Sequence, residues 1–214
     1  MMSNEALILD LSASLVPVRR RNMLREAALL LALAAAELAL FLGLGLMRPD
    51  MGRMIASPYM LWKLGSLALL ALIGCAIAIR SFAPTARPRR ALLLAASLAL
   101  MAMIAGAFVP PGSDTAPALL DRLSPVHGLL CAVSIIILSM PIMAMLAVFM
   151  RRAAPTHPEG SALATGLAAS ACGAFIFAFC CPINDPLYII VWYSVACLIV
   201  AVAARWLLPG RFLL

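Results

Sequence analysis

Six long apolar stretches, separated by short gaps rich in proline and charge, constrain this sequence more than any other feature. Each has 19–24 residues, enough for a helix to cross about 30 Å of hydrocarbon at about 1.5 Å per residue. The stretches are Ala27–Met47, Met60–Ile79, Ala91–Val109, His127–Met150, Ser161–Cys181 and Leu187–Leu208. None has the alternation of a transmembrane β-strand. The sequence therefore predicts an all-α fold, a six-helix transmembrane bundle.

The composition excludes most soluble classes of protein. Of the 214 residues, 65% are apolar and 12% charged, against about 45–50% and about 25% in soluble domains. Six spans and their loops leave no room for a separate soluble domain, such as a nucleotide-binding fold. We expect three parts: an N-terminal segment over 1–26, a membrane domain over 27–208 and a tail over 209–214.

Lys and Arg residues are distributed unevenly between the two sides of the predicted bundle, and their excess marks the cytoplasmic side. Twelve flank the side that holds both termini: Arg19, Arg20, Arg21, Arg25, Arg80, Arg87, Arg89, Arg90, Arg151, Arg152, Arg205 and Arg211. Four flank the other: Arg48, Arg53, Lys63 and Arg122. Both termini are therefore predicted to be cytoplasmic. The net charge of +7 is mostly a topology signal, so we expect contact with membrane lipid and no nucleic-acid partner.

The N-terminal segment has an amphipathic pattern. Its apolar residues Leu7, Ile8, Leu11 and Leu15 fall on one face of a helix, with acidic and serine side chains on the others. A helix that lies on the membrane surface usually carries Lys or Arg on its polar face. Because this helix carries acids there, the pattern favours docking into the groove of a partner protein over lying on anionic lipid.

The six cysteines include no Cys-x-x-Cys motif, so a thioredoxin-like redox pair is not indicated. Three lie within predicted spans and are interpreted as small apolar residues: Cys75, Cys172 and Cys197. The topology places the other three, Cys131, Cys180 and Cys181, at the outer boundary, an oxidising location in a bacterial inner membrane. A disulfide between Cys131 and either Cys180 or Cys181 is sterically feasible.

A metal site is a second interpretation of the same region. His127 precedes Cys131 by four residues and shares its helix face. Together with Cys181 and Asp185, these residues are candidate ligands for a soft metal. The alternative is that His127 is an interfacial residue at the start of a helix.

Two charged residues lie inside predicted spans. Glu37 is near the centre of the first span, where ionisable side chains are costly and often functional. No acid or base lies at matching depth in another span, so we interpret Glu37 as a protonated, hydrogen-bonded residue of the bundle. Lys63 lies within one turn of the outer boundary, and we expect its ammonium group to extend toward water.

Several short motifs occur in an order that resembles a known membrane family. They are Leu7-Ile8-Leu9-Asp10-Leu11, Pro17-Val18-Arg19-Arg20, Arg48-Pro49-Asp50, Ser57-Pro58, Trp62-Lys63-Leu64, Cys131, Ala154-Pro155 with Pro158, and Cys181 with Asp185 and Trp192-Tyr193. In this order, over nearly the whole chain, they resemble the NrsF-type integral-membrane anti-sigma factors. That family consists of proteobacterial negative regulators of an extracytoplasmic-function sigma factor.

The resemblance implies a regulator and no enzyme. The N-terminal segment would bind and sequester the sigma factor at the bacterial inner membrane. Cys131 and Cys181 would sense heavy-metal or oxidative stress and cause its release. Cys180 is an extra neighbour, so which of the adjacent thiols reacts stays open. No cofactor is implied beyond transient ligation of a heavy metal.

The residues alone leave open two other functions and the formation of a homodimer. A membrane thiol-disulfide oxidoreductase would need a second, exchanging dithiol. A metal or small-solute transporter would rest on Glu37 and the thiols. Homodimerisation could use a stripe of small residues at four-residue spacing, formed by Gly166, Ser170 and Ala174, because such stripes let helices approach closely.

Overall fold

The structure, a computed structural model, describes residues 12–13, 21–83, 86, 88–108, 123, 125–153 and 155–209. Its helices are α2 (Met23–Gly43), α3 (Met51–Met54), α4 (Pro58–Ser81), α5 (Pro88–Ala107), α7 (Pro125–Ala153), α8 (Pro158–Ala178) and α9 (Pro186–Leu207). All but α3 are long and apolar enough to cross a membrane. The described residues contain no strand. The predicted all-α bundle of six long helices is therefore confirmed.

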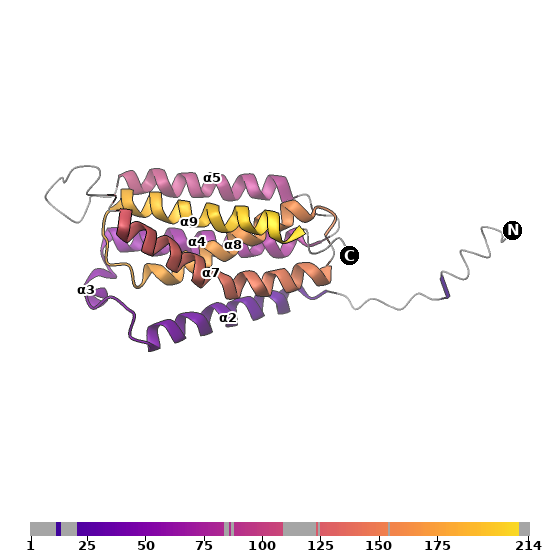
Figure 1. The fold of residues 1–214 in the computed structure, drawn as a ribbon, viewed down its shortest axis with the longest axis horizontal. Coiled ribbons are helices and arrows are strands. Elements are labelled where there is room, and N and C mark those ends of the chain that lie inside the picture. Colours follow the sequence, from indigo (N-terminus) through magenta and orange to yellow (C-terminus); the bar gives the residue numbers. More distant parts are fainter. Residues whose placement is uncertain are drawn as a thin grey trace.

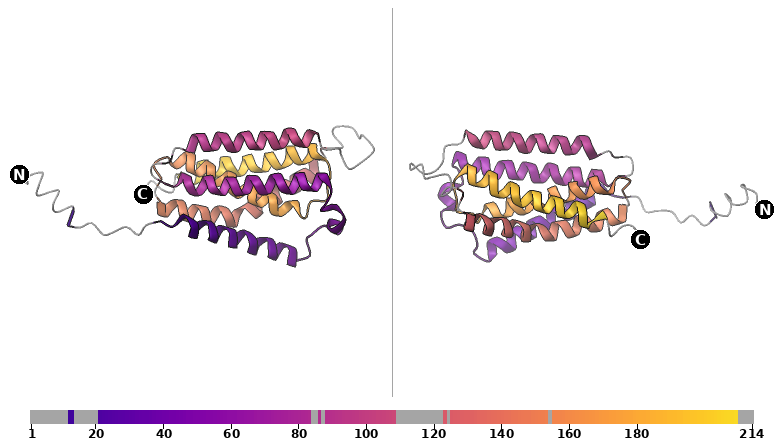
Figure 2. Two further views of the ribbon diagram at one scale, coloured as in Figure 1. Left: turned by 180° about the vertical axis from the view of Figure 1, so that it is seen from behind. Right: turned by 45° about the horizontal axis from the view of Figure 1, so that its top comes forward.

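The six long helices lie side by side and alternate in direction (Figure 1, Figure 2). The start of α2 and the end of α9 consequently lie at the same end of the bundle (Figure 1). We call this the Arg-rich end, because eight described arginines flank it: Arg21, Arg25, Arg80, Arg89, Arg90, Arg151, Arg152 and Arg205. The opposite end, which holds α3 and residues 179–185 between α8 and α9, is called the cysteine end.

Polar side chains and prolines define the helix starts. Asn22 accepts from the backbone N–H groups of Leu24 and Arg25 at 3.1 and 3.2 Å, which caps α2. Ser57 accepts from Met60 at 3.3 Å, and Pro58 follows as the first residue of α4.

One predicted boundary matters for the candidate site. The fifth span was predicted to reach Cys181, but α8 ends at Ala178. Apolar residues continue past the end of the helix, so hydropathy does not mark it. Cys180 and Cys181 therefore lie in the segment that connects α8 to α9 and not in a helix.

Helix α8 is the centre of the bundle. Of its most apolar window, 78% of the residues are buried inside the protein, against 6% for α2 and for α5. Small residues allow this: a Cβ atom on Gly166 would lie 2.7 Å from the Cα atom of Ala201, and one on Gly173 would lie 2.8 Å from the carbonyl oxygen of Ile135. The stripe of Gly166, Ser170 and Ala174 is thus buried inside the chain, with Gly166 against α9, and is not exposed to a second copy.

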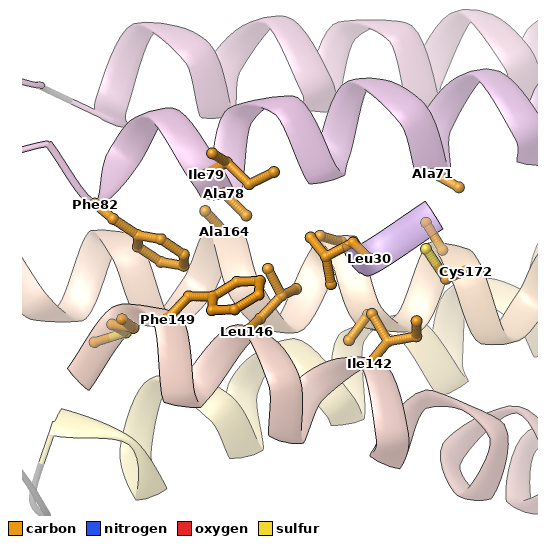
Figure 3. Packing of buried hydrophobic residues seen from close by; sticks show 14 of the residues in the cluster. Leu30, Ala71, Ala78, Ile79, Phe82, Ile142, Leu146, Phe149, Ala164 and Cys172 are labelled. Atoms are coloured by element: carbon orange, nitrogen blue, oxygen red, sulfur yellow. The ribbon is translucent and has the colours of Figure 1, made fainter. Parts of the chain in front are cut away.

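Helix α2 packs at the edge of the bundle. Its one buried residue is Leu30, which meets Ile142 and Leu146 of α7 (Figure 3). Large apolar side chains on the rest of α2, such as Leu31 and Leu40, are exposed on the protein surface. An apolar surface of this kind suits a helix that faces lipid.

Candidate functional site

Two thiols from different elements meet at the cysteine end. Cys131 lies in the second turn of α7, and Cys181 follows the end of α8. Both side chains are buried, with 7% and 0% of their surface exposed, in one apolar cluster. The two thiols are hydrogen-bonded to each other, and the sulfur of Cys131 also lies 3.2 Å from the hydroxyl of Tyr188. The expected convergence of Cys131 and Cys181 is observed, with both thiols free.

The neighbouring residue Cys180 has a different environment. Its side chain is half-buried, and burial raises the pKa of its thiol. The pKa of the Cys181 thiol is lowered, chiefly by the hydrogen bond from Cys131 and further by the positive charge of Lys63, although burial opposes both. Because the thiolate is the reactive form of cysteine, the structure distinguishes two adjacent thiols that sequence reasoning left equivalent.

Lys63 is buried inside the protein, so the prediction that its ammonium extends toward water is wrong. Its side chain is 0% exposed, and its Nζ atom donates to the carbonyl oxygen of Cys181 at 3.3 Å. The rings of Tyr59 and Tyr193 lie 6.0 and 5.8 Å from the same nitrogen. Carbonyl and ring faces replace the water that the ammonium loses on burial.

Arg48 joins the segment after α2 to the segment that carries Cys181. The side chain, 4% exposed, donates to the side-chain oxygen of Asn184 at 2.9 Å and to the carbonyl of Cys181 at 3.4 Å. Its backbone N–H donates to the carbonyl of Phe179 at 3.2 Å. Asp50 accepts from Arg48 Nε at 2.6 Å, and this pairing lowers the pKa of Asp50 and raises that of Arg48.

The four candidate metal ligands do not assemble. In the described part of the chain, no group of three or more His, Cys, Asp and Glu residues is placed to hold a metal ion. His127 is exposed at the start of α7, and Asp185 caps α9 by accepting from the N–H of Leu187 at 2.9 Å. Of the proposed set, only the thiols of Cys131 and Cys181 come together.

The Arg-rich end anchors the start of α2. Arg21 pairs with Glu26 of the first turn and donates to the carbonyl of Ile79 in α4 at 3.2 Å. Its guanidinium also lies 5.2 Å from the centre of the Phe82 ring. The proposed binding residues themselves lie outside the described residues: Leu7, Ile8, Leu11 and Leu15.

Comparison with known proteins assigns the chain to a family. The sequence model of the family described as "Negative regulator of sigma F", NrsF, matches residues 11–214. The chain belongs to the NrsF family. It is 29% identical to the anti-sigma-F factor NrsF of Caulobacter vibrioides (strain NA1000 / CB15N), over 84% of this chain and 83% of that protein. No solved structure matches the chain.

Membership in the NrsF family confirms the resemblance found in the sequence motifs. It makes the chain a member of a regulatory, non-enzymatic family of anti-sigma factors, whose partner is a sigma factor. The six long apolar helices fit a membrane protein.

The structure of this NrsF-family chain also contains a thiol pair that the sequence interpretation missed. Cys75 and Cys172, interpreted as separate apolar residues, have their sulfur atoms 3.6 Å apart. Cys172 also interacts electrostatically with Glu37 of α2. The buried Oε2 atom of Glu37 has no hydrogen-bond partner in the described part of the protein, contrary to the expected hydrogen bond. Helix pairing creates these contacts, and no spacing within one segment signals them.

Proposed function

We propose that this protein binds an extracytoplasmic-function sigma factor through residues 1–26 and keeps it at the bacterial inner membrane, away from RNA polymerase. Family membership supports a sigma factor as the partner. Residues Leu7, Ile8, Leu11 and Leu15 provide the apolar face for docking. The segment leads directly into α2, which begins at the Arg-rich end.

The proposed orientation has the Arg-rich end in the cytoplasm. Eight described arginines flank that end, whereas Arg48, Arg53 and Lys63 are the described cations at the cysteine end. This asymmetry has the sign of the positive-inside rule. The orientation brings the N-terminal segment to the compartment that holds sigma factors and the Cys131–Cys181 pair to the periplasmic side.

In this proposal the Cys131–Cys181 pair is the sensor of external stress. Oxidation would join the two sulfurs and pass two protons and two electrons to the external oxidant. Ligation of a heavy metal would instead hold both sulfurs, as thiolates, on one ion. Either event changes the contact between the start of α7 and the segment after α8, and so disturbs the carbonyl of Cys181.

The observation that carries the proposal is the set of bonds between Arg48 and the segment after α8. Through them the thiol site is attached to the far end of α2, the same helix that begins where the N-terminal segment ends. Helix α2 buries a single residue, Leu30, so it can shift against the bundle at little packing cost. A change at Cys181 would move Arg48, then α2, and so Arg21 and the sigma-binding segment.

Co-purification tests the sigma-binding half of the proposal. The full chain and a version that lacks residues 2–18 are purified in detergent together with the sigma factors of the source bacterium. We expect the full chain to retain one sigma factor and the shortened version to retain none. Ser12→Ala with Ser14→Ala, on the polar face of the helix predicted from the sequence, is the matched control and should retain the sigma factor. Equal retention by the full and shortened chains, or none by either, would contradict the proposal.

A further inference from the structure

A second pair of thiols lies within the bundle, between α4 and α8. The sulfur atoms of Cys75 and Cys172 are 3.6 Å apart, against about 2.05 Å in a disulfide. The two helix backbones approach closely beside the pair, because a Cβ atom on Gly74 would lie 3.2 Å from the Cα atom of Ala168. Side-chain rotation can therefore bring the sulfurs together with little movement of the helices.

Both thiols line an apolar cavity of about 550 Å³ beneath α2. Every other described lining residue is Ala, Leu, Ile or Phe, so among the residues that the structure describes the two thiols are the only reactive groups on its wall. A cavity of this volume is in the range that holds small organic ligands, about 300–1,000 Å³. Its lining favours an apolar molecule that partitions into the bilayer and disfavours charged or strongly hydrated reagents.

We propose that Cys75 and Cys172 are a redox-active dithiol that a lipid-soluble quinone in this cavity oxidises to a disulfide. One of the two sulfurs, as its thiolate, adds to the quinone. The other sulfur then attacks the first and forms the S–S bond, while the bond to the quinone breaks and its electron pair stays on the quinone. The protons released by the two thiols complete the hydroquinone, so two thiols and one quinone give one disulfide and one hydroquinone.

This dithiol works independently of the Cys131–Cys181 pair. Ala178, at the end of α8, lies six residues after Cys172, which is about 9 Å along the helix axis. Cys181 lies three residues further along the chain. Thiol–disulfide exchange requires sulfur-to-sulfur contact, so the two pairs do not exchange within this fold. A negative result for the Cys75–Cys172 dithiol would therefore leave the proposed function unaffected, and the reverse also holds.

Thiol counting after exposure to a quinone tests the proposal. The full chain with Cys131, Cys180 and Cys181 replaced by serine retains Cys75, Cys172 and Cys197; it is purified in detergent and incubated with decylubiquinone. After denaturation and alkylation, mass spectrometry should show the loss of two thiols, a linked peptide pair holding Cys75 and Cys172, and an intact Cys197. Retention of all three thiols, a stable quinone adduct, or equal loss of Cys197 would overturn the proposal.

A further variant and a second oxidant separate the chemistry from a folding defect. In Cys75→Ser no disulfide can form between these two positions, so the linked peptide pair should be absent and Cys197 should stay intact, with the melting temperature of the purified protein as a check on folding. Hydrogen peroxide at equal oxidising equivalents should oxidise the pair more slowly than the quinone, because the apolar lining disfavours a strongly hydrated reagent. Equal rates with the two oxidants would contradict the assigned cavity.

Discussion

The buried ammonium of Lys63 donates to the carbonyl oxygen of Cys181 across 3.3 Å. The backbone of Cys181 is thus held by a positive charge from α4. Arg48, in the segment after α2, donates to the same carbonyl oxygen. Two cations from separate elements therefore converge on one residue between α8 and α9. This convergence distinguishes Cys181 from its neighbour Cys180, so we expect the thiols of the two residues to react differently.

Replacing Lys63 should make Cys181 less reactive. The charge of Lys63 lowers the pKa of the Cys181 thiol, so Lys63→Met should move the midpoint of its alkylation upward by about one pH unit or more. The rate of alkylation by iodoacetamide, followed by mass spectrometry between pH 5 and pH 9 (roughly the range in which shifted thiols ionise), measures this midpoint. Arg53→Met removes an exposed cation at the same end and should leave the midpoint unchanged. An equal shift in both variants would contradict the assigned role of Lys63.

Within the unaltered protein, Cys181 should ionise at lower pH than Cys180. The pKa of Cys181 is lowered by its hydrogen bond from Cys131, whereas burial raises that of Cys180. At neutral pH the thiolate fraction is therefore larger for Cys181, and the difference in thiolate fraction should narrow as the pH rises above the pKa of Cys180. Separate alkylation profiles of Cys180→Ser and Cys181→Ser give the two midpoints. A lower midpoint for Cys180 would reverse the assignment of the reactive thiol.

Arg48 should be needed for transmission of the stress signal to the sigma factor and not for modification of the two thiols. Arg48→Met removes the bonds to Asn184 and Cys181, at a cost in stability of about 1–3 kcal/mol. In a strain that carries a sigma-dependent reporter, we expect this variant to show altered induction by stress while its thiols at 131 and 181 are still modified. Normal induction together with normal thiol modification would exclude the proposed route through α2.

The sequence predicts the architecture well, because a continuous apolar run of about 20 residues has few stable solutions in a bilayer. The sequence does not predict contacts between side chains of different helices. Hydropathy treats Lys63 as an isolated charge, although rings and a carbonyl from three elements surround it. The contact of Cys75 with Cys172 likewise depends on which helices pair and at what depth, and no periodicity within one helix encodes that.

The end of α8 illustrates a second limit. Residues after Ala178 remain apolar up to Cys181, so the apolar run passes smoothly from the helix into a buried connection. The convergence of Cys131 and Cys181 could be foreseen from topology alone, because adjacent spans bring one residue to the start of α7 and the other to the end of α8. The environment of the two thiols could not be foreseen, because Tyr188 contacts Cys131 from α9 and Lys63 contacts Cys181 from α4.

Removing both thiols should abolish the response to stress. In Cys131→Ser with Cys181→Ser, neither a disulfide nor a two-thiolate metal complex can form at the cysteine end. We expect the reporter to lose its induction by an oxidant or a heavy-metal salt, while sigma binding in unstressed cells stays intact. Cys197→Ser alters a thiol within α9 and should respond normally. Full induction in the double variant would refute the sensor role.

Adding a side chain at Gly166 should destabilise the fold and leave the oligomeric state unchanged. The added Cβ atom would lie 2.7 Å from both the Cα atom of Ala201 and the Cβ atom of Ala204. Backbone atoms cannot move aside as a flexible side chain would, so Gly166→Val should lower the free energy of unfolding by about 1–3 kcal/mol. Gly65→Ala is the control, because nothing lies within 4 Å of its added Cβ atom. Unfolding in detergent and size-exclusion chromatography measure stability and assembly; a normal stability with a changed oligomeric state would instead identify the stripe as a contact between copies.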